Sequence, residues 1–406
     1  MNGHPSASAA FLCIIRANTP SFYDNRLITI PNSLQRLIAY RCTSILNSLF
    51  PATTIATAMN LTLFIPDLFW SDPSIPEIYH DLSLPSVERL LAKSTTVSME
   101  PEDREIWLCK QFNVTQQQND WPIASIMLHR DAPSIAKNNK EFWMRADPVH
   151  LRIEQNHLML ADNQVFDISQ QEAARLVQDI NHSLGNNNHY TLFSLRPDRW
   201  YVRIAQAPDI QTYTLGQVTC KNINQYLPTG NDSIAWRKIL NEIQMLLHEH
   251  PVNQARESRG ELSINSIWLW GGGYFPDSLK SSYTQIWGDH DFVHALASAC
   301  GVTASNLPQD VNDWLQSQTS GNHLVVLDWL YAKAKYNDAY RWRETLGAIE
   351  MKWFLPLYKA LKGGRINKLQ IITSNNNSLQ NFTLTRADLW KFWLATKPLH
   401  SYNKRN

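Results

Sequence analysis

The feature that most constrains the fold is a strand-like run that ends in three glycines, INSIWLWGGGYFP at residues 264–276. Residues 266–270 are apolar almost throughout, which is typical of a strand covered on both faces, as in a parallel sheet between two layers of helices. Three consecutive glycines let the backbone turn sharply and approach a ligand with free N–H groups. The same triplet can be only a tight turn, and it lacks the spacing of a dinucleotide-binding motif.

From residue 59 onward, strand patterns alternate with helix patterns. MNLTLFIPDLFW begins like a core strand at Met59, and LPSVERLLAKS (84–94) has the spacing of a helix. Near the C-terminus, HLVVLDWL (323–330) and LQIIT (369–373) predict strands on either side of a long helical stripe. This order predicts an α/β fold with a mostly parallel sheet flanked by helices.

A stretch of different character interrupts this pattern. Residues 150–162 resemble a hairpin, residues 169–185 predict a helix with a Ser169–Glu172 capping box, and residues 199–204 alternate like a half-exposed strand. We therefore expect an inserted, smaller α+β lid domain at 143–231 and a core built from 59–142 and 232–406. Strands 61–69 and 266–270 should then share one sheet.

Residues 1–58 have no sustained period of 2 or 3.6. We interpret them as a flexible N-terminal extension; a short partner-binding or targeting segment is the alternative. Composition adds several exclusions. The formal net charge is +1, the five cysteines form no CxxC pair, and no apolar run reaches the roughly 20 residues of a membrane span. We expect a cytoplasmic protein that binds neither nucleic acid nor membrane.

With its approach helix included, the opening stretch resembles a known family. HEHPVNQARESRGELSINSIWLWGGGYFP (248–276) is similar to the archaeal-type, cofactor-independent phosphoglycerate mutases of the alkaline phosphatase superfamily. Four segments resemble more closely a bacterial branch named for regulation of pathogenicity factors, type E. They are RADPVHLR (145–152), LNEIQMLLHEHPVN (240–253), INSIWLWGGG (264–273) and LTRADLWKFW (384–393). The resemblance implies the inserted lid and the alkaline-phosphatase-like core.

The resemblance also implies a two-metal site, usually with manganese, and a phosphorylated serine. Asp67 stands at the first metal aspartate, and Glu102 stands where the serine belongs, before Asp103. The later Asp and His ligand positions carry Tyr331 and Lys335, and a further Asp–His pair is replaced by Ser374–Asn375. Asp67 and Asp103 are therefore expected as remnants, with no confident metal ligand and no cofactor.

We expect the cleft instead to bind a small anionic metabolite, while any protein partner is unknown. The candidate residues are the glycine turn, two residues of the approach helix and three residues of the lid hinge, namely Gly271, Gly272, Gly273, Arg256, Asn253, Asp147, His150 and Arg152. Each arginine can also be a surface ion-pair partner, and Asp147 and His150 can be purely structural.

Three hypotheses remain open from the sequence. The first is a pseudoenzyme of the mutase fold that serves as a regulatory or ligand-binding protein. The second is an active, metal-dependent phosphoglycerate mutase or phosphatase whose ligands come from unexpected positions. The third, suggested by the fifteen tryptophans, is an interaction scaffold.

Overall fold

The computed structural model describes residues 59–72, 74–136, 140–154, 157–185, 189–316 and 320–403. Residues 57–406 form one compact unit. The expected N-terminal extension, residues 1–58, lies outside the described residues. No helix in the described part of the chain is long and apolar enough to reach across a lipid bilayer.

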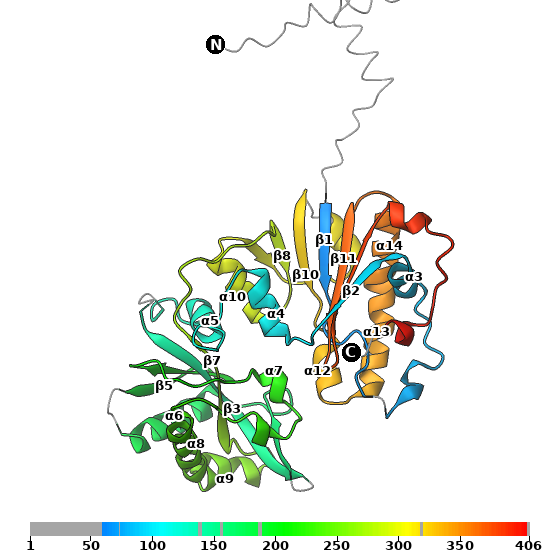
Figure 1. The fold of residues 1–406 in the computed structure, drawn as a ribbon. Coiled ribbons are helices and arrows are strands. Elements are labelled where there is room, and N and C mark those ends of the chain that lie inside the picture. The colour runs from blue at the N-terminus through cyan, green and yellow to red at the C-terminus, as the bar shows by residue number, and fades with distance from the viewer. Residues whose placement is uncertain are drawn as a thin grey trace, which may run out of the picture. The chain divides into compact units, whose positions relative to one another are not determined.

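The first sheet has seven strands, and five of them run parallel, as the sequence predicts (Figure 1). The two strands at one edge are antiparallel to their neighbours. In spatial order the strands are β2 (Thr95–Met99), β12 (Leu379–Thr385), β11 (Lys368–Ser374), β1 (Met59–Phe64), β10 (Gly321–Val326), β8 (Gln285–Trp287) and β9 (Thr303–Ser305).

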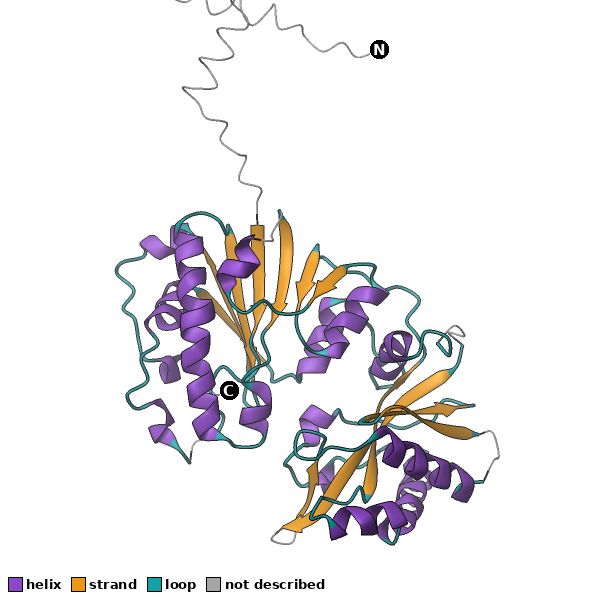
Figure 2. Cartoon of the chain, turned by 180° about the vertical axis from the view of Figure 1, so that it is seen from behind, coloured by secondary structure: helices purple, strands orange, loops and turns teal. Residues whose placement is uncertain are grey.

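Helices cover both faces of this sheet, as Figure 2 shows from behind. One face packs its apolar side chains against α3, α11, α13, the π-helical turn η3 and α14, and the other against α4, α5 and α10. Their bounds are α3 (Pro85–Lys93), α4 (Arg104–Gln111), α5 (Ile123–Asp131), α10 (Asp291–Ala299), α11 (Val311–Gln316), α13 (Ala339–Ile349), η3 (Glu350–Phe354) and α14 (Leu355–Lys362). The mixed α/β fold with a mostly parallel, helix-flanked sheet is thus confirmed.

The second sheet is antiparallel and has five strands. Its strands are β4 (His157–Ala161), β3 (Phe142–Glu154), β6 (Arg199–Ile204), β5 (Tyr190–Arg196) and β7 (Ser266–Gly273), which pairs with β3. α6 (Gln170–Ser183) and α8 (Ser233–His248) share a hydrophobic cluster with these strands, and α9 (Pro251–Ser258) follows α8. The predicted capping box is present at the start of α6, because Ser169 accepts from the N–H of Glu172 and Glu172 accepts from that of Ser169.

The expected position of the glycine-ended strand is wrong. β7 does not lie beside β1 in the first sheet but pairs with β3 in the second (Figure 1). Its alternate side chains still enter two hydrophobic clusters, Trp268 and Trp270 on one face and Ile267 and Leu269 on the other. Burial on both faces explains the apolar run, and such a run does not reveal which sheet a strand joins. The lid domain at 143–231 stays a prediction. Its expected boundary at residue 231 would separate α8 and β7 from the second sheet, although both pack with that sheet.

The described residues also include four short 3₁₀ helices. They are η1 (Pro76–Tyr79), η2 (Ile223–Gln225), η4 (Ala387–Trp390) and η5 (Leu399–Tyr402). Two helical turns, α7 (Leu215–Val218) and α12 (Tyr331–Lys335), lie at the cleft described next.

Candidate functional site

The carboxyl ends of the parallel strands border a cleft that consists of two adjoining cavities. The inner cavity has a volume of about 200 Å³ and the outer cavity about 420 Å³. Both are lined by Arg104, Gly216, Tyr331 and Lys335. Asp67, directly beyond β1, lines the inner cavity. This is the edge at which open α/β sheets bind their ligands.

The main chain of Asp67 is held at both of its polar groups. Its N–H donates to the carbonyl oxygen of Ser374 at 2.8 Å, and its carbonyl accepts from Nε1 of Trp342 at 2.9 Å. The residue has a left-handed backbone, with φ of 57°. Burial raises the pKa of Asp67 to about 6, although the ammonium of Lys335 acts in the opposite direction. The Asp67 carboxyl at the inner cavity is therefore protonated in about half of the molecules near pH 6.

A second carboxylate and a second ammonium complete the inner cavity. Asp103 precedes α4 and accepts a hydrogen bond from the Thr214 hydroxyl. Burial acts to raise the pKa of Asp103, but Lys335 and hydrogen bonds outweigh it and hold the pKa below its usual value. The pKa of Lys221 is lowered by burial and by the charge of Lys335. Two carboxyl groups and two amines thus share one small space.

Arg104 is fixed between the two cavities. Its guanidinium bonds Glu105 at 2.6 Å and Asp328 at 3.3 Å, and lies 3.0 Å from Nε2 of His290. It also stacks 4.0 Å from the centre of the Tyr331 ring. Burial raises the pKa of Glu105 to about 7, with Arg104 opposing, and burial together with Arg104 keeps the pKa of His290 well below its usual value. Arg104 is therefore a permanently charged, pre-oriented group in the wall of the cleft.

In the outer cavity, Asp147 holds Arg145 in place. The two side chains pair at 2.5 Å, and Asp147 also accepts from Nε1 of Trp270 at 2.8 Å and from the N–H of Trp200 at 3.2 Å. Burial raises the pKa of Asp147 and Arg145 opposes the rise. The structure thus places the predicted residue Asp147 in the cleft, where it is held by two tryptophans and pairs with Arg145.

The predicted glycine residues lie elsewhere. All three are buried inside β7, and the N–H of Gly272 donates to Oδ2 of Asp120 at 3.2 Å. A Cβ on Gly272 would lie 3.1 Å from side-chain atoms of Met144 and Phe142, and one on Gly273 would lie 2.6 Å from Cβ of Pro122. The expectation that the N–H of Gly272 is free for an anion is wrong. Because the glycines have no Cβ atoms, side chains of β3 and of the start of α5 can pack directly against β7.

Arg256 and Asn253 are also remote from the cleft. Arg256 is fully buried and donates to the carbonyl oxygens of Leu262 and Asp167 and to the carboxylate of Glu172. Asn253 donates to the carbonyl of Ile264 at 2.9 Å and accepts from its N–H at 2.8 Å. Both side chains fix the approach to β7.

His150 and Arg152 extend along β3 away from the cleft. Nδ1 of His150 lies 2.7 Å from the carbonyl oxygen of Ser263, and Arg152 forms an exposed ion pair with Glu154 at 2.8 Å. Sequence reasoning did not select Lys221 or Arg104, which do line the cleft. Lys221 carries no local signal, whereas Arg104 follows Asp103 directly and could have been found from that neighbour.

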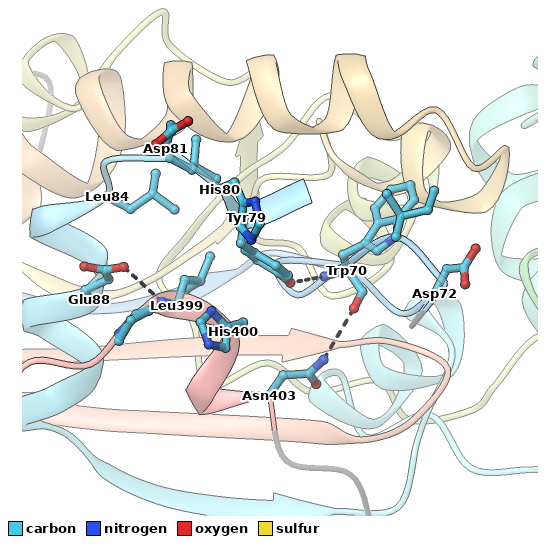
Figure 3. Close-up of a pocket in the computed structure, with 13 residues that line it drawn as sticks. Trp70, Asp72, Tyr79, His80, Asp81, Leu84, Glu88, Leu399, His400 and Asn403 are labelled. Atoms are coloured by element: carbon cyan, nitrogen blue, oxygen red, sulfur yellow. Dashed lines mark hydrogen bonds between the residues drawn. The ribbon is translucent and has the colours of Figure 1, made fainter. Parts of the chain in front are cut away.

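A separate cavity of about 690 Å³ lies between the segment after β1 and the C-terminal residues (Figure 3). There, the N–H of Trp70 donates to the Tyr79 hydroxyl at 2.8 Å, and the N–H of Leu399 donates to Oε1 of Glu88 at 2.9 Å. None of the described residues that line it is a lysine or arginine. The cleft, in contrast, has lysine and arginine side chains in its lining, next to several carboxylates.

Part of the chain is similar in sequence to known proteins. Residues 133–253 match the family model of 2,3-bisphosphoglycerate-independent phosphoglycerate mutase. The chain is 29% identical over 141 residues to the protein of that name from Methanosarcina mazei, covering 33% of this chain and 34% of the relative. It is 45% identical over 68 residues to the one from Methanothrix thermoacetophila, covering 17% of each. The alignments thus span about a third or less of these relatives' length, and the chain is phosphoglycerate mutase-like over that part.

A solved structure supports the fold over more of the chain. The PH0037 protein from Pyrococcus horikoshii superposes with a TM-score of 0.50 at 10% identity, covering 81% of this chain and 88% of that one. At this identity the likeness concerns the fold alone. The family match at 133–253 includes β3 to α8 and does not reach Asp67, Tyr331 or Lys335.

Proposed function

We propose that this chain is a phosphoglycerate mutase-like protein that binds a small phosphorylated anion in its cleft without two-metal phosphoryl transfer. In this proposal it is a regulatory or ligand-binding member of the bacterial branch named above, within the alkaline phosphatase superfamily, and it acts in the cytoplasm. The observation that carries the proposal is the ammonium of Lys335 beside Asp67 and Asp103.

The donor chemistry of the inner cavity does not fit a pair of divalent metals. Two cations bridged in one centre need several carboxylate or imidazole ligands. The described residues contain no group of three or more His, Cys, Asp or Glu side chains arranged to hold a metal ion. The carboxylates that line the inner cavity are those of Asp67, Glu102 and Asp103. Glu102 pairs with Lys110, and the amines of Lys221 and Lys335 in the same lining repel a metal cation.

The same groups suit an anion. Lys221, Lys335 and Arg104 converge on the inner cavity, and Arg145 and Arg199 line the outer one. Amines and guanidinium groups bind phosphate and carboxylate oxygens through charge-assisted hydrogen bonds. The two cavities together are large enough for a three-carbon phosphate ester.

An active, manganese-dependent mutase or phosphatase is the alternative, and the names of the relatives favour it. Elemental analysis of purified protein, paired with an assay of 2- and 3-phosphoglycerate interconversion in added manganese, separates the two. We expect no stoichiometric metal and no turnover. Tightly bound metal together with interconversion would overturn the proposal.

Binding is tested by calorimetric titration with 3-phosphoglycerate, with and without a chelator. We expect chelator-independent binding that weakens at least about tenfold in Lys335→Met, because a buried charge-assisted contact is lost. Lys352→Met, which removes an exposed lysine of η3, is the matched control and should bind like the parent. Equal affinity in both variants would exclude Lys335 from the site.

A further inference from the structure

Four large apolar side chains project into solvent from one short segment that begins at the last residue of η4. Trp390, Phe392, Trp393 and Leu394 have exposed fractions of 76%, 87%, 67% and 36%. We call this segment, residues 390–394, the aromatic loop. Single exposed apolar residues are common on protein surfaces, but a contiguous patch of this kind marks a surface that binds something.

A buried lysine side chain forms hydrogen bonds with the backbone of the aromatic loop. Lys93 of α3 is 8% exposed, and its Nζ donates to the carbonyl oxygens of Lys391, at 2.6 Å, and Leu394. Lys391 in turn pairs with Asp388 at 2.7 Å, and Asp388 accepts from the N–H of Thr385, also at 2.7 Å. The rings are therefore presented by a fixed main chain, which reduces the entropy lost when they are buried.

The surface around the aromatic loop is basic although the whole chain is nearly neutral. From Lys359 to Lys397 the sequence has seven lysine and arginine residues and a single acidic residue, the paired Asp388. Strand pairing joins Thr385 to Lys368, and Nη1 of Arg386 lies 3.1 Å from where a Cβ of Gly364 would be.

These contacts bring the residues that follow α14 next to Thr385 and Arg386, which lead into η4 and the aromatic loop. Figure 1 draws the red segment beside the upper end of α14. Lys362, Arg365 and Arg386 are exposed there. The carboxylate of Glu88, on the neighbouring helix α3, is bonded to the N–H of Leu399.

We propose that this basic and aromatic surface docks on an anionic phospholipid membrane. The aromatic loop would enter the headgroup region, where tryptophan rings are preferred, and the surrounding cations would face the lipid phosphates and carboxylates. Exposed aromatic rings surrounded by cationic side chains suit an anionic lipid surface, because such a surface has negatively charged headgroups above an apolar interior. Binding to it requires no complementary groove. This surface is separate from the cleft, so the proposal does not depend on what the cleft binds.

The test is co-sedimentation of the full chain with vesicles of phosphatidylcholine alone or with about 30% phosphatidylserine. We expect binding to the anionic vesicles only, weakening as salt is raised. The double variant Phe392→Ser/Trp393→Ser should lose at least about tenfold in affinity, and Lys362→Gln/Arg386→Gln should lose about tenfold or more.

The matched control is Ile234→Ser/Tyr340→Ser, which removes two side chains that are 82% and 78% exposed on α8 and α13. It should bind vesicles like the parent, and all variants should keep the parent's melting temperature. Equal vesicle binding by the aromatic-loop variant and the parent would overturn the proposal. So would a parent that ignores vesicles but forms a dimer or complex that Phe392→Ser/Trp393→Ser abolishes, which would assign the loop to a protein partner.

Discussion

Gly216 of α7 and Tyr331 of α12 meet so closely that a Cβ on the glycine would lie 2.0 Å from the phenol oxygen and 2.6 Å from Oδ1 of Asp103. The adjoining Thr214 hydroxyl donates to the same carboxylate. α7 therefore packs directly on residues of the inner cavity, and its Gly216 lines both cavities.

We expect Gly216→Ala to lift α7 from the cleft. The added methyl group cannot fit beside Tyr331, so the free energy of unfolding should fall by about 1–3 kcal/mol and anion affinity should change. Urea denaturation and ligand titration measure the two effects. Gly347→Ala in α13, where no atom lies within 4 Å of the new methyl, is the control and should be neutral or stabilising by up to about 1 kcal/mol. Wild-type stability in Gly216→Ala would contradict this account of α7.

The buried carboxyl of Asp67 predicts a specific dependence of stability on pH. Its folded-state pKa of about 6 exceeds the ordinary aspartate value of 3.8, so between these values the folded state binds more protons and stability falls as pH rises. Asp67→Asn cannot ionise. Its stability relative to the parent should therefore increase from pH 4 to pH 7, by roughly 1–3 kcal/mol. Urea denaturation of both proteins across that range measures it, and a constant difference would show that the pKa is not raised.

Arg199 pairs with a buried carboxylate, so replacing this arginine should lower the free energy of unfolding. Its Nη1 lies 2.9 Å from Asp131, whose side chain is fully buried. Arg199→Met leaves this charge with less compensation, and we expect a destabilisation of about 3 kcal/mol. Arg175→Met removes an arginine that is 61% exposed and pairs with Asp179 along α6, so it should change stability by less than about 0.5 kcal/mol. Similar losses in both variants would mean that burial adds nothing to the Arg199 pair.

Gly272→Val tests the role of the glycines in β7. If the glycines bind the anion, as the sequence predicts, this change should weaken anion binding. From the structure, the new side chain meets Met144 and Phe142, so the free energy of unfolding should fall by about 1–3 kcal/mol while the folded protein still binds 3-phosphoglycerate normally. Thermal unfolding and titration well below the melting temperature distinguish the outcomes. A stable variant that no longer binds would restore the glycine site.

The strand and helix patterns predicted most of the elements but not all of their partners. The capping box of α6 and the mostly parallel character of the first sheet follow from local spacing and from the alternation of strand and helix patterns. The pairing of β7 with β3 depends on long-range packing that periodicity does not encode. For the cleft, Asp67 and Asp103 could be found because the family resemblance places them at the first metal aspartate and at the aspartate after the serine position. Lys221 could not, since only the fold brings it to them.

The pairing of β7 with β3 also has a consequence for the chain during its synthesis and for the fragments that can be produced from it. The second sheet receives its fifth strand only after α7, α8 and α9 have been added to the chain. A nascent chain, or a fragment that ends at residue 253 with the family match, would leave β3 with an open edge along 143–149. Such an edge invites pairing with other chains. A soluble fragment of this region must therefore extend through Gly273, and on the ribosome this part of the protein stays vulnerable to aggregation until that glycine has emerged.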